Sequence, residues 1–466
     1  MKAAFPRALV LFLGALMLLS CASLGASGSR QAWRPPRPVA IKGESITWSN
    51  VVPSGGTWGT YVPWGGTGGL LVRDGDLVVS DASSSSPSCW FLYEQSDGDS
   101  LQLREEDGRL LLSGKTISVA PADNATCWEW LDQASAKDLR SLRFLMVPDR
   151  MDENRLQTLK KLAAVNHDLS LGMGSISSSV SAAALFKPRT LFLEDSVTGT
   201  ELAGILAGQN QIETLIITST DATNLDSLAT LPTLCRLAIF DWDPATTGPL
   251  PEGMRALKSL LLSGSGELDA SALAAVPDGI EEISLVEYDT ITGIAALERF
   301  HNLRTLILNG SEGIGDLSTL ESLKKLAWVG LPADITQEQF SAFIGKHTAV
   351  QIVELIECSE ITDLSPLQRL TGLTGLVVKC QHAEELAAMD AVDQLRSLRF
   401  LGIPGGITAK DLARISEALP RTLVVPTCLG SGWILLVIPL AALMWVAGSR
   451  ARSRRCTSQQ GADRRR

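Results

Sequence analysis

The sequence predicts an α/β solenoid of about 13 short coils, with a parallel sheet on the concave face, helices or irregular turns on the convex face, and a small β-rich domain in front. Two observations lead to this fold class. The stretch "LRSLRFLMVP" begins at Leu139, and a near copy, "LRSLRFLGIP", begins at Leu395. Between them, a pattern of one apolar, one variable and one apolar residue returns every 22 to 25 residues. The two copies are therefore an early and a late coil of one repeat array.

Each return of the pattern predicts one short strand, usually with a leucine three positions upstream. A single coil cannot bury its leucines alone, whereas stacked coils align them into a continuous core and their strands into a parallel sheet. The first core positions of the predicted strands are Leu145, Leu169, Leu191, Leu215, Leu237, Leu260, Ile283, Leu306, Val329, Val353, Leu376, Leu401 and Leu423.

This spacing resembles that of leucine-rich repeat proteins. "ITDLSPLQRLTGLTGLVV", which begins at Ile361, is similar to the short repeat of the internalin-like members, and "LSTLESLKKL", from Leu317, follows it in part. Asn309 is the one good match to the asparagine that usually follows the strand in this family. The resemblance covers roughly residues 139–427. It implies a surface protein whose repeats form a binding scaffold, with ligands that differ among members.

Three coils are predicted to carry true helices on the convex face. In each, a proline precedes a residue that can cap a helix: Asp152, Thr336 or Thr408. Gln339 and Asp411 stand in the third helical position after two of these caps, where a side chain can complete a capping box.

Residues 45–134 do not share the period and follow a linker at 27–44. Gly-rich turns and runs of alternating polarity predict a small β-rich domain there, whereas residues 135–427 form the repeat domain. Cys89 and Cys127, each followed by Trp, are candidates for a disulfide. We expect some element to cap the exposed leucine edge of the first coil.

The amino terminus predicts a secretory signal peptide over residues 1–26. Lys2 and Arg7 precede an uncharged run that begins at Ala8, and small residues follow it. The alternative is a lipoprotein signal, because "LLSC" places Cys21 where a bacterial lipid anchor is attached.

The carboxyl terminus predicts one transmembrane helix at 428–449 and a basic cytoplasmic tail at 450–466. No charge occurs between Arg421 and Arg450, and the uncharged stretch is long enough to cross a bilayer. Arginines follow at once, so the repeat domain is expected outside the cell membrane, extracellular or periplasmic. Cys456 in the tail is a candidate for palmitoylation.

The charge balance limits the classes of partner that we expect. The net charge of −10 includes five basic residues at 1–37 and seven arginines with one aspartate at 450–466, which leaves 29 basic and 50 acidic residues between. A domain with a balance of −21 is a poor candidate for nucleic acid or anionic lipid. Protein or other extracytoplasmic ligands are the expected partners.

No motif predicts catalysis, a cofactor or a metal. The chain has no CxxC, HExxH or GxSxG, and its four histidines fall in different coils. We therefore predict that the protein is not an enzyme.

The concave face offers candidate binding residues. The position between the two core residues of each strand faces that side, and the sequence there is poor in charge. An exposed apolar stripe marks an interaction surface. The ligand-face candidates are Phe192, Ile216, Phe240, Leu261, Ile307 and Trp328. The alternative is that these residues reflect β-propensity and are partly shielded by neighbouring loops.

Cys358 and Cys380 follow successive strands, so adjacent coils bring them close enough for a disulfide, with two small buried residues as the alternative. Taken together, the sequence predicts a single-span membrane protein that presents an acidic leucine-rich repeat domain for recognition. A rival from another class is a structural or anchored envelope component, of lipoprotein or sorting-signal type, with a permanent protein partner.

Overall fold

The computed structural model describes the backbone of the strands between residues 38 and 119, and residues 121–427 except 122, 143, 149–150, 168, 174–181, 221–223, 380–394 and 405–407. The predicted signal peptide, transmembrane helix and basic tail lie outside these residues, as do Cys21 and Cys456. Among the described residues, no helix is both long and apolar enough to cross a membrane.

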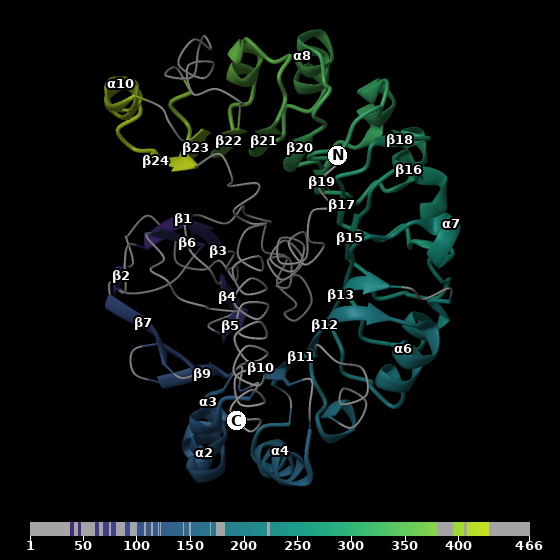
Figure 1. The fold of residues 1–466 in the computed structure, drawn as a ribbon. Helices are drawn as coiled ribbons and strands as arrows, with labels where there is room; N and C mark the ends of the chain where they lie inside the picture. The colour runs from purple at the N-terminus through teal and green to yellow at the C-terminus, as the bar shows by residue number, and fades with distance from the viewer. Residues whose placement is uncertain are drawn as a thin grey trace, which may run out of the picture.

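The strands of the repeats form one curved sheet, and the helices lie on its outer side (Figure 1). Each strand pairs in parallel with the next one along the chain, as the repeat pattern predicted. This leucine-rich repeat solenoid confirms the predicted fold class. Its strands are β10 (Phe144–Val147), β11 (Ser170–Met173), β12 (Thr190–Val197), β13 (Thr214–Thr220), β14 (Arg236–Ile239), β15 (Ser259–Ser263), β17 (Glu282–Val286), β19 (Thr305–Ile307), β20 (Trp328–Leu331), β21 (Ile352–Ile356), β22 (Gly375–Lys379), β23 (Phe400–Pro404) and β24 (Leu423–Thr427).

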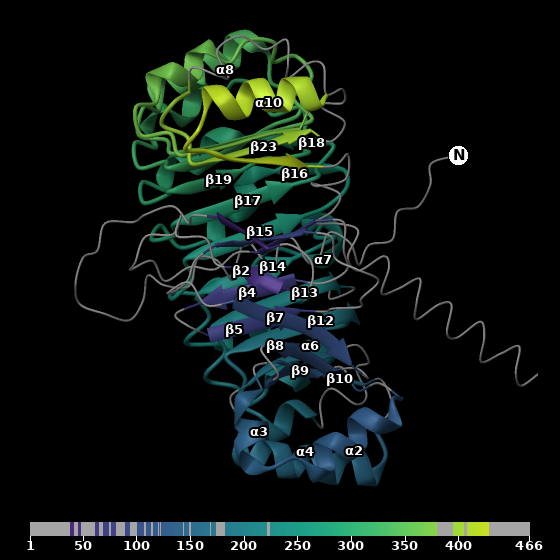
Figure 2. The same cartoon turned by 90° about the vertical axis from the view of Figure 1, so that its left-hand side faces the viewer.

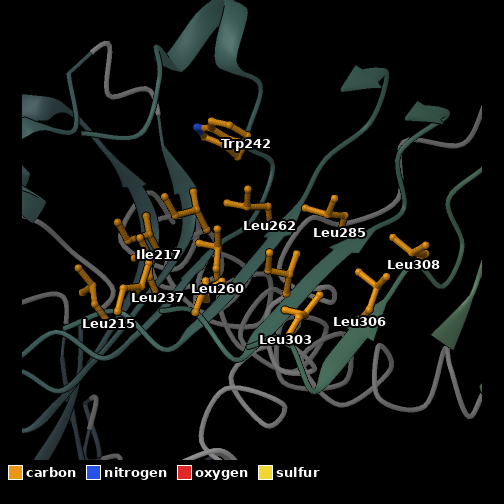
Figure 3. Packing of buried hydrophobic residues seen from close by; sticks show 14 of the residues in the cluster. Leu215, Ile217, Leu237, Trp242, Leu260, Leu262, Leu285, Leu303, Leu306 and Leu308 are labelled. Carbon is orange, nitrogen blue, oxygen red and sulfur yellow. The ribbon is translucent and has the colours of Figure 1, made fainter. Parts of the chain in front are cut away.

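The core lies between the sheet and the convex segments. Alternate strand residues point inward, so each strand contributes two neighbouring columns of apolar side chains. Leu215 and Ile217 of β13, for example, stack beside Leu237 of β14 and Leu260 of β15, all of them buried (Figure 3). The coils therefore share one continuous core.

Helices cover the convex side of several coils. The three predicted from their caps are present: α4 (Glu153–Val165) after Asp152, α8 (Gln337–Lys346) after Thr336, and α10 (Ala409–Ala418) after Thr408. Other helices in the described part of the chain include α2 (Ala125–Gln133), α3 (Ala136–Ser141), α6 (Gly199–Leu206) and α7 (Pro244–Thr247).

Short 3₁₀ helices take the same place in other coils. They are η3 (Asp226–Thr230), η4 (Ala270–Ala275), η5 (Ile294–Arg299), η6 (Leu317–Ser322) and η7 (Ser365–Arg369). The strands β16 (Glu267–Asp269) and β18 (Thr290–Thr292) pair in parallel as a separate two-stranded sheet.

Two predicted strand positions are out of register. Leu145 pairs with Leu171, not with Leu169, and Leu401 pairs with Val424, not with Leu423. In "LSLGM" two leucines stand one residue apart, so the pattern fits equally well after a shift of two positions. In "LVV" every residue is apolar, so no alternation marks the inward side. Pairing with the neighbouring strand decides the register in both cases.

The amino-terminal strands lie on the open side of the arc (Figures 1 and 2). The antiparallel strands β7 (Ser100–Glu106), β8 (Arg109–Leu112) and β9 (Lys115–Val119) continue the sheet, and β9 pairs in parallel with β10. Val119 is fully buried in the core column of Leu145. Strand pairing therefore crosses the predicted domain boundary at residue 135, and β9 covers the edge of the first predicted coil.

The remaining amino-terminal strands pair antiparallel with one another or with β7, in keeping with the β-rich composition of this region. They are β1 (Pro38–Ile41), β2 (Ser45–Thr47), β3 (Tyr61–Trp64), β4 (Gly69–Arg73), β5 (Asp76–Ser80) and β6 (Cys89–Tyr93).

Asn309 does not have the place in the coil that the resemblance implied. Its side-chain amide donates to Glu354 on the concave side. The turn after the strand is instead held by Ser311, whose hydroxyl donates to the carbonyl of Leu285 one coil earlier. Cys358 has the equivalent place two coils later, with its Sγ 3.4 Å from the carbonyl oxygen of Pro332.

Candidate functional site

Two rows of side chains form the concave face. The rows are the residues directly before and directly after the first core position of each strand. Successive side chains of a strand point to opposite faces, so both of these residues point away from the core. The first concave row is Thr190, Thr214, Arg236, Ser259, Glu282, Thr305, Trp328 and Ile352. The second concave row is Phe192, Ile216, Ala238, Leu261, Ser284, Ile307, Gly330 and Glu354.

The structure places the ligand-face candidates on this side of the sheet. The candidates in the second row are Phe192, Ile216, Leu261 and Ile307; Trp328 lies in the first row, and Phe240 follows β14. The register corrections replace Ser170 by Gly172 and Val424 by Val425 in the second row.

We expected these candidates to be exposed, and this prediction is wrong for five of the six. Ile216, Phe240, Leu261, Ile307 and Trp328 are buried, and only Phe192 is partly exposed. One physical reason is mutual shielding, because Ile307 and Trp328 pack against Ile352 in an apolar cluster of their own, separate from the main core. Their role in ligand binding stays a prediction.

A hydrogen-bonded network surrounds Glu354 at the centre of the face. The Nε1 of Trp328 donates to its Oε1 at 2.8 Å, and the Nδ2 of Asn309 donates to its Oε2 at 2.5 Å. Asn309 reaches Glu354 from two strands away by crossing Gly330, where a Cβ would collide with its amide group. Both oxygens of the carboxyl group therefore have a donor, although burial still raises the pKa of Glu354.

Glu282, in the first concave row on β17, is a second buried carboxyl group on this face. Its Oε1 makes no hydrogen bond, and burial raises the pKa of the carboxyl group well above its ordinary value. Its direct neighbour on β19 is Thr305, whose Oγ1 is buried and also without a hydrogen-bond partner. The Oδ1 of Asn309 is the third buried oxygen in this part of the face that lacks a partner.

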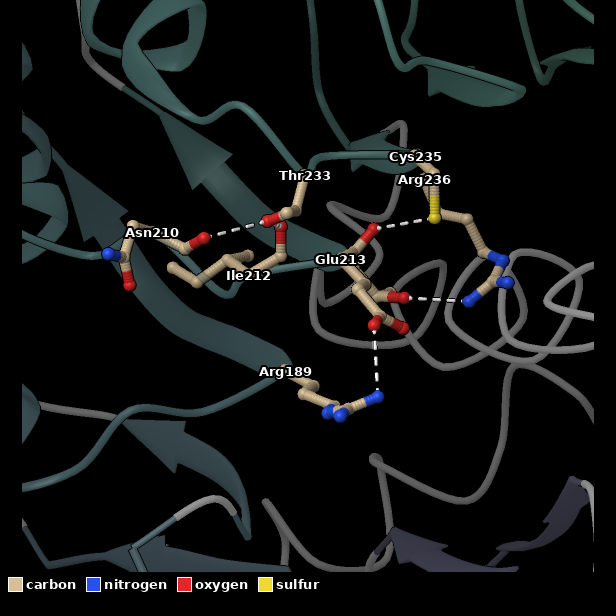
Figure 4. A network of polar contacts seen from close by, with 8 residues as sticks. Arg189, Asn210, Ile212, Glu213, Thr233, Cys235 and Arg236 are labelled. Carbon is tan, nitrogen blue, oxygen red and sulfur yellow. Dashed lines mark hydrogen bonds and ion pairs between the residues drawn. The ribbon is translucent and has the colours of Figure 1, made fainter. Parts of the chain in front are cut away.

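Charged side chains line one rim of the concave face, at the residue before each strand or at its first residue. Arg189 donates to the carboxylate of Glu213 at 3.1 Å, the Sγ of Cys235 lies 3.2 Å from the Glu213 carbonyl oxygen, and Arg236 donates to Thr214 (Figure 4). In later coils, the Oε1 of Glu281 lies 3.3 Å from the Nζ of Lys258, and its Oε2 lies 3.8 Å from the Nε of Arg304. Ion pairs and hydrogen bonds therefore join neighbouring coils along this rim and help to keep them aligned.

Sequence reasoning missed the polar part of the site. Glu282 and Thr305 lie in the first concave row, whereas the prediction considered mainly the second. Glu354 was in the predicted column but was not singled out, and Asn309 was assigned to the coil turn. The signal that could have found the two glutamates is a carboxylate at a concave strand position whose neighbours are uncharged. Ser259 and Thr305 flank Glu282, and Gly330 and Val377 flank Glu354.

The predicted disulfides stay predictions. Cys380 lies outside the described residues, and only the backbone of Cys89 is described. Cys127 and Cys358 are both buried. Among the residues that the structure describes, no group of three or more His, Cys, Asp or Glu side chains is arranged to hold a metal ion.

Solved structures similar to the chain are repeat proteins. An internalin C2 of Listeria monocytogenes has 21% identity, covering 44% of this chain and 92% of its own, with a TM-score of 0.31. An internalin (inlF) of the same organism has 17% identity over 66% and 90%, with a TM-score of 0.36. A leucine-rich repeat protein of Leptospira interrogans has 13% identity over 66% and 99%, with a TM-score of 0.34. No protein-family model and no curated protein matches the sequence.

Proposed function

We propose that the chain is a membrane-anchored protein that presents its acidic leucine-rich repeat domain outside the membrane and binds a protein or other extracytoplasmic ligand, without catalysis. The concave face is the binding surface. The observation that carries this proposal is the set of large side chains that face away from the core, such as Ile216, Leu261, Ile307 and Trp328, none of which belongs to the main core cluster. Apolar and aromatic residues of this kind anchor protein interfaces.

The uncharged stretch 428–449 and the arginines that follow it support a single span with the carboxyl terminus in the cytoplasm.

A second candidate is a structural envelope component whose concave face is permanently covered. The burial of five ligand-face candidates favours it, because a face that waits for a soluble ligand should be open to water. The two functions differ in the state of the isolated domain.

Light scattering with an apolar dye on secreted residues 31–427 separates the two. A soluble monomer that binds the dye is expected of a recognition module, and replacing the partly exposed Phe192 by Ser should reduce the dye signal. Stable self-association would instead favour the structural component. A monomer that binds no dye would remove the physical support for an open recognition face.

A further inference from the structure

We propose that the chain's own amino-terminal region covers the concave face, with the uncharged segment 45–72 as the cover, so that a ligand has to displace this segment. The recognition face is then closed at rest. The inference rests on the proposed function in one respect, because that function places the uncharged stretch 428–449 in the membrane and so excludes it as the cover.

The first step of the argument concerns Leu261, which points away from the core and yet is only 2% exposed. It belongs neither to the main core cluster nor to the cluster around Trp328. Its direct neighbours in the second concave row are Ala238 and Ser284, and serines flank it on the same side of its own strand. Neighbours on a sheet shield the flanks of a side chain, and neighbours this small do not reach above a leucine. Another part of the chain therefore lies over Leu261.

The second step is that burial of the second concave row changes along the array. Ile216 and Leu261 in the middle coils are buried, whereas Phe192 and Val377 nearer the two ends are partly exposed. Val377 is smaller than Leu261 and has the larger Glu354 beside it, yet it is the more exposed of the two. Shielding within the sheet does not account for this difference, whereas a cover over the middle coils does.

The third step identifies the occupant by its place in the fold. β5 lies against β9 and β10, β4 pairs with β5, and β3 lies against β4. These strands lie inside the arc of the solenoid, on the side away from the convex helices (Figures 1 and 2). They form a second layer that starts at the first coils, and segment 45–72 contains β3 and most of β4.

The composition of segment 45–72 suits this face. It contains no Asp, Glu, Lys or Arg, although 20% of the chain is charged, and it carries Trp48, Trp58, Tyr61 and Trp64. The second concave row is likewise uncharged from β12 to β19. Aromatic side chains gain a large area of contact when they are buried against such a surface. An extended segment of this length spans about 90 Å, and β10 and β17 are about 30 Å apart along the sheet, so the segment is long enough to reach the middle coils.

Thiol alkylation of the full chain in detergent micelles tests the cover. Leu261→Cys and Val377→Cys are treated with iodoacetamide in separate samples, and peptide mass spectrometry follows the rate at each position. Neither position shares a tryptic peptide with a native cysteine. We expect Leu261→Cys to react at least tenfold more slowly than Val377→Cys, because only the first lies under the cover.

A second set of variants loosens the cover. Leu70→Glu combined with Leu71→Glu places charge on β4, and one of the two side chains faces the array because successive side chains of a strand point to opposite faces. This pair should speed the alkylation of Leu261→Cys at least tenfold and leave the rate at Val377→Cys unchanged. Ser84→Glu combined with Ser85→Glu adds the same charge outside the segment and is the matched control.

Three results would overturn the cover. An unchanged rate at Leu261→Cys after the Leu70 and Leu71 substitutions would mean that the face buries its own side chains. Equal acceleration by the Ser84 and Ser85 substitutions, or at Val377→Cys, would indicate general loosening of the fold. Equally fast alkylation of Leu261→Cys and Val377→Cys in the chain with an intact segment would show an open face, which contradicts the cover and supports the proposed function.

Discussion

At the scale of single residues, His347 couples the stability of the repeats to pH. It follows α8, is buried, and has an Nδ1 without a hydrogen-bond partner. Desolvation, with a smaller contribution from Lys324, lowers its pKa from 6.5 to about 4. The folded state therefore binds fewer protons than the unfolded state between these values, so stability present above pH 6.5 is lost as the pH falls towards 4.

We expect this loss to be about 1 to 2 kcal/mol, after allowance for partial solvent screening. His347→Gln should flatten the pH dependence of the free energy of unfolding in that window, measured by urea denaturation at several pH values. His301→Gln changes an exposed histidine on the convex side and is the matched control. An identical pH profile for wild type and His347→Gln would refute the assignment.

Gly330 supports the Glu354 network through the absence of a side chain. A Cβ at this position would collide with the Asn309 amide, so Gly330→Ala should displace Asn309 from Glu354 and cost about 1 to 3 kcal/mol. Gly372→Ala is the matched control, because the nearest atom to its added Cβ would be 3.8 Å away. Equal urea midpoints for the two variants would show that Asn309 moves aside without loss.

At the scale of elements, the helix caps were the most predictable feature. Thr336 accepts from the backbone N–H of Gln339, whose side chain accepts in return from the backbone N–H of Thr336, as the capping-box pattern indicated. The same signal at Thr198 and Glu201 precedes α6, but the sequence prediction considered only segments that follow a proline.

We expect Thr336→Ala to lower the free energy of unfolding by about 1 kcal/mol, because the start of α8 loses a side-chain acceptor. Thr371→Ala, at an exposed turn, is the control. Thermal and urea unfolding of both variants provide the measurement. A loss of the same size in Thr371→Ala would mean that the cap contributes nothing specific.

Strand register was only partly predictable, for a physical reason. Where one apolar residue alternates with one polar residue, as at Ile283, Ser284 and Leu285, the inward positions follow from the sequence alone. At Leu169 and Leu423 more than one register buries apolar residues, and the neighbouring strand selects among them. Likewise, the network of Asn309, Trp328 and Glu354 combines residues of three repeats, and a periodic pattern read one repeat at a time does not show such a combination.

At the scale of the whole molecule, most interactions that stabilise the solenoid join neighbouring coils. Each strand pairs with the strand before it and the strand after it, and the core is a stack of columns rather than a central cluster. In such a fold, stability is approximately a sum of terms for the repeats and their interfaces. The same substitution should therefore act differently in the middle and near the end of the array.

Leu306→Ala and Leu401→Ala remove equivalent side chains, both buried in the core column, from β19 and β23. A leucine truncated in a core costs about 2 to 5 kcal/mol. Near the carboxyl end, the substitution should lead only the last coils to open. In the middle of the array, it weakens the interfaces that join the two halves of the solenoid. Hydrogen exchange should show faster exchange only around β22 to β24 in Leu401→Ala, and on both sides of β19 in Leu306→Ala. Uniformly faster exchange in both variants would instead mean that the array unfolds as one cooperative unit, in which case the concave face could not open locally to admit a ligand.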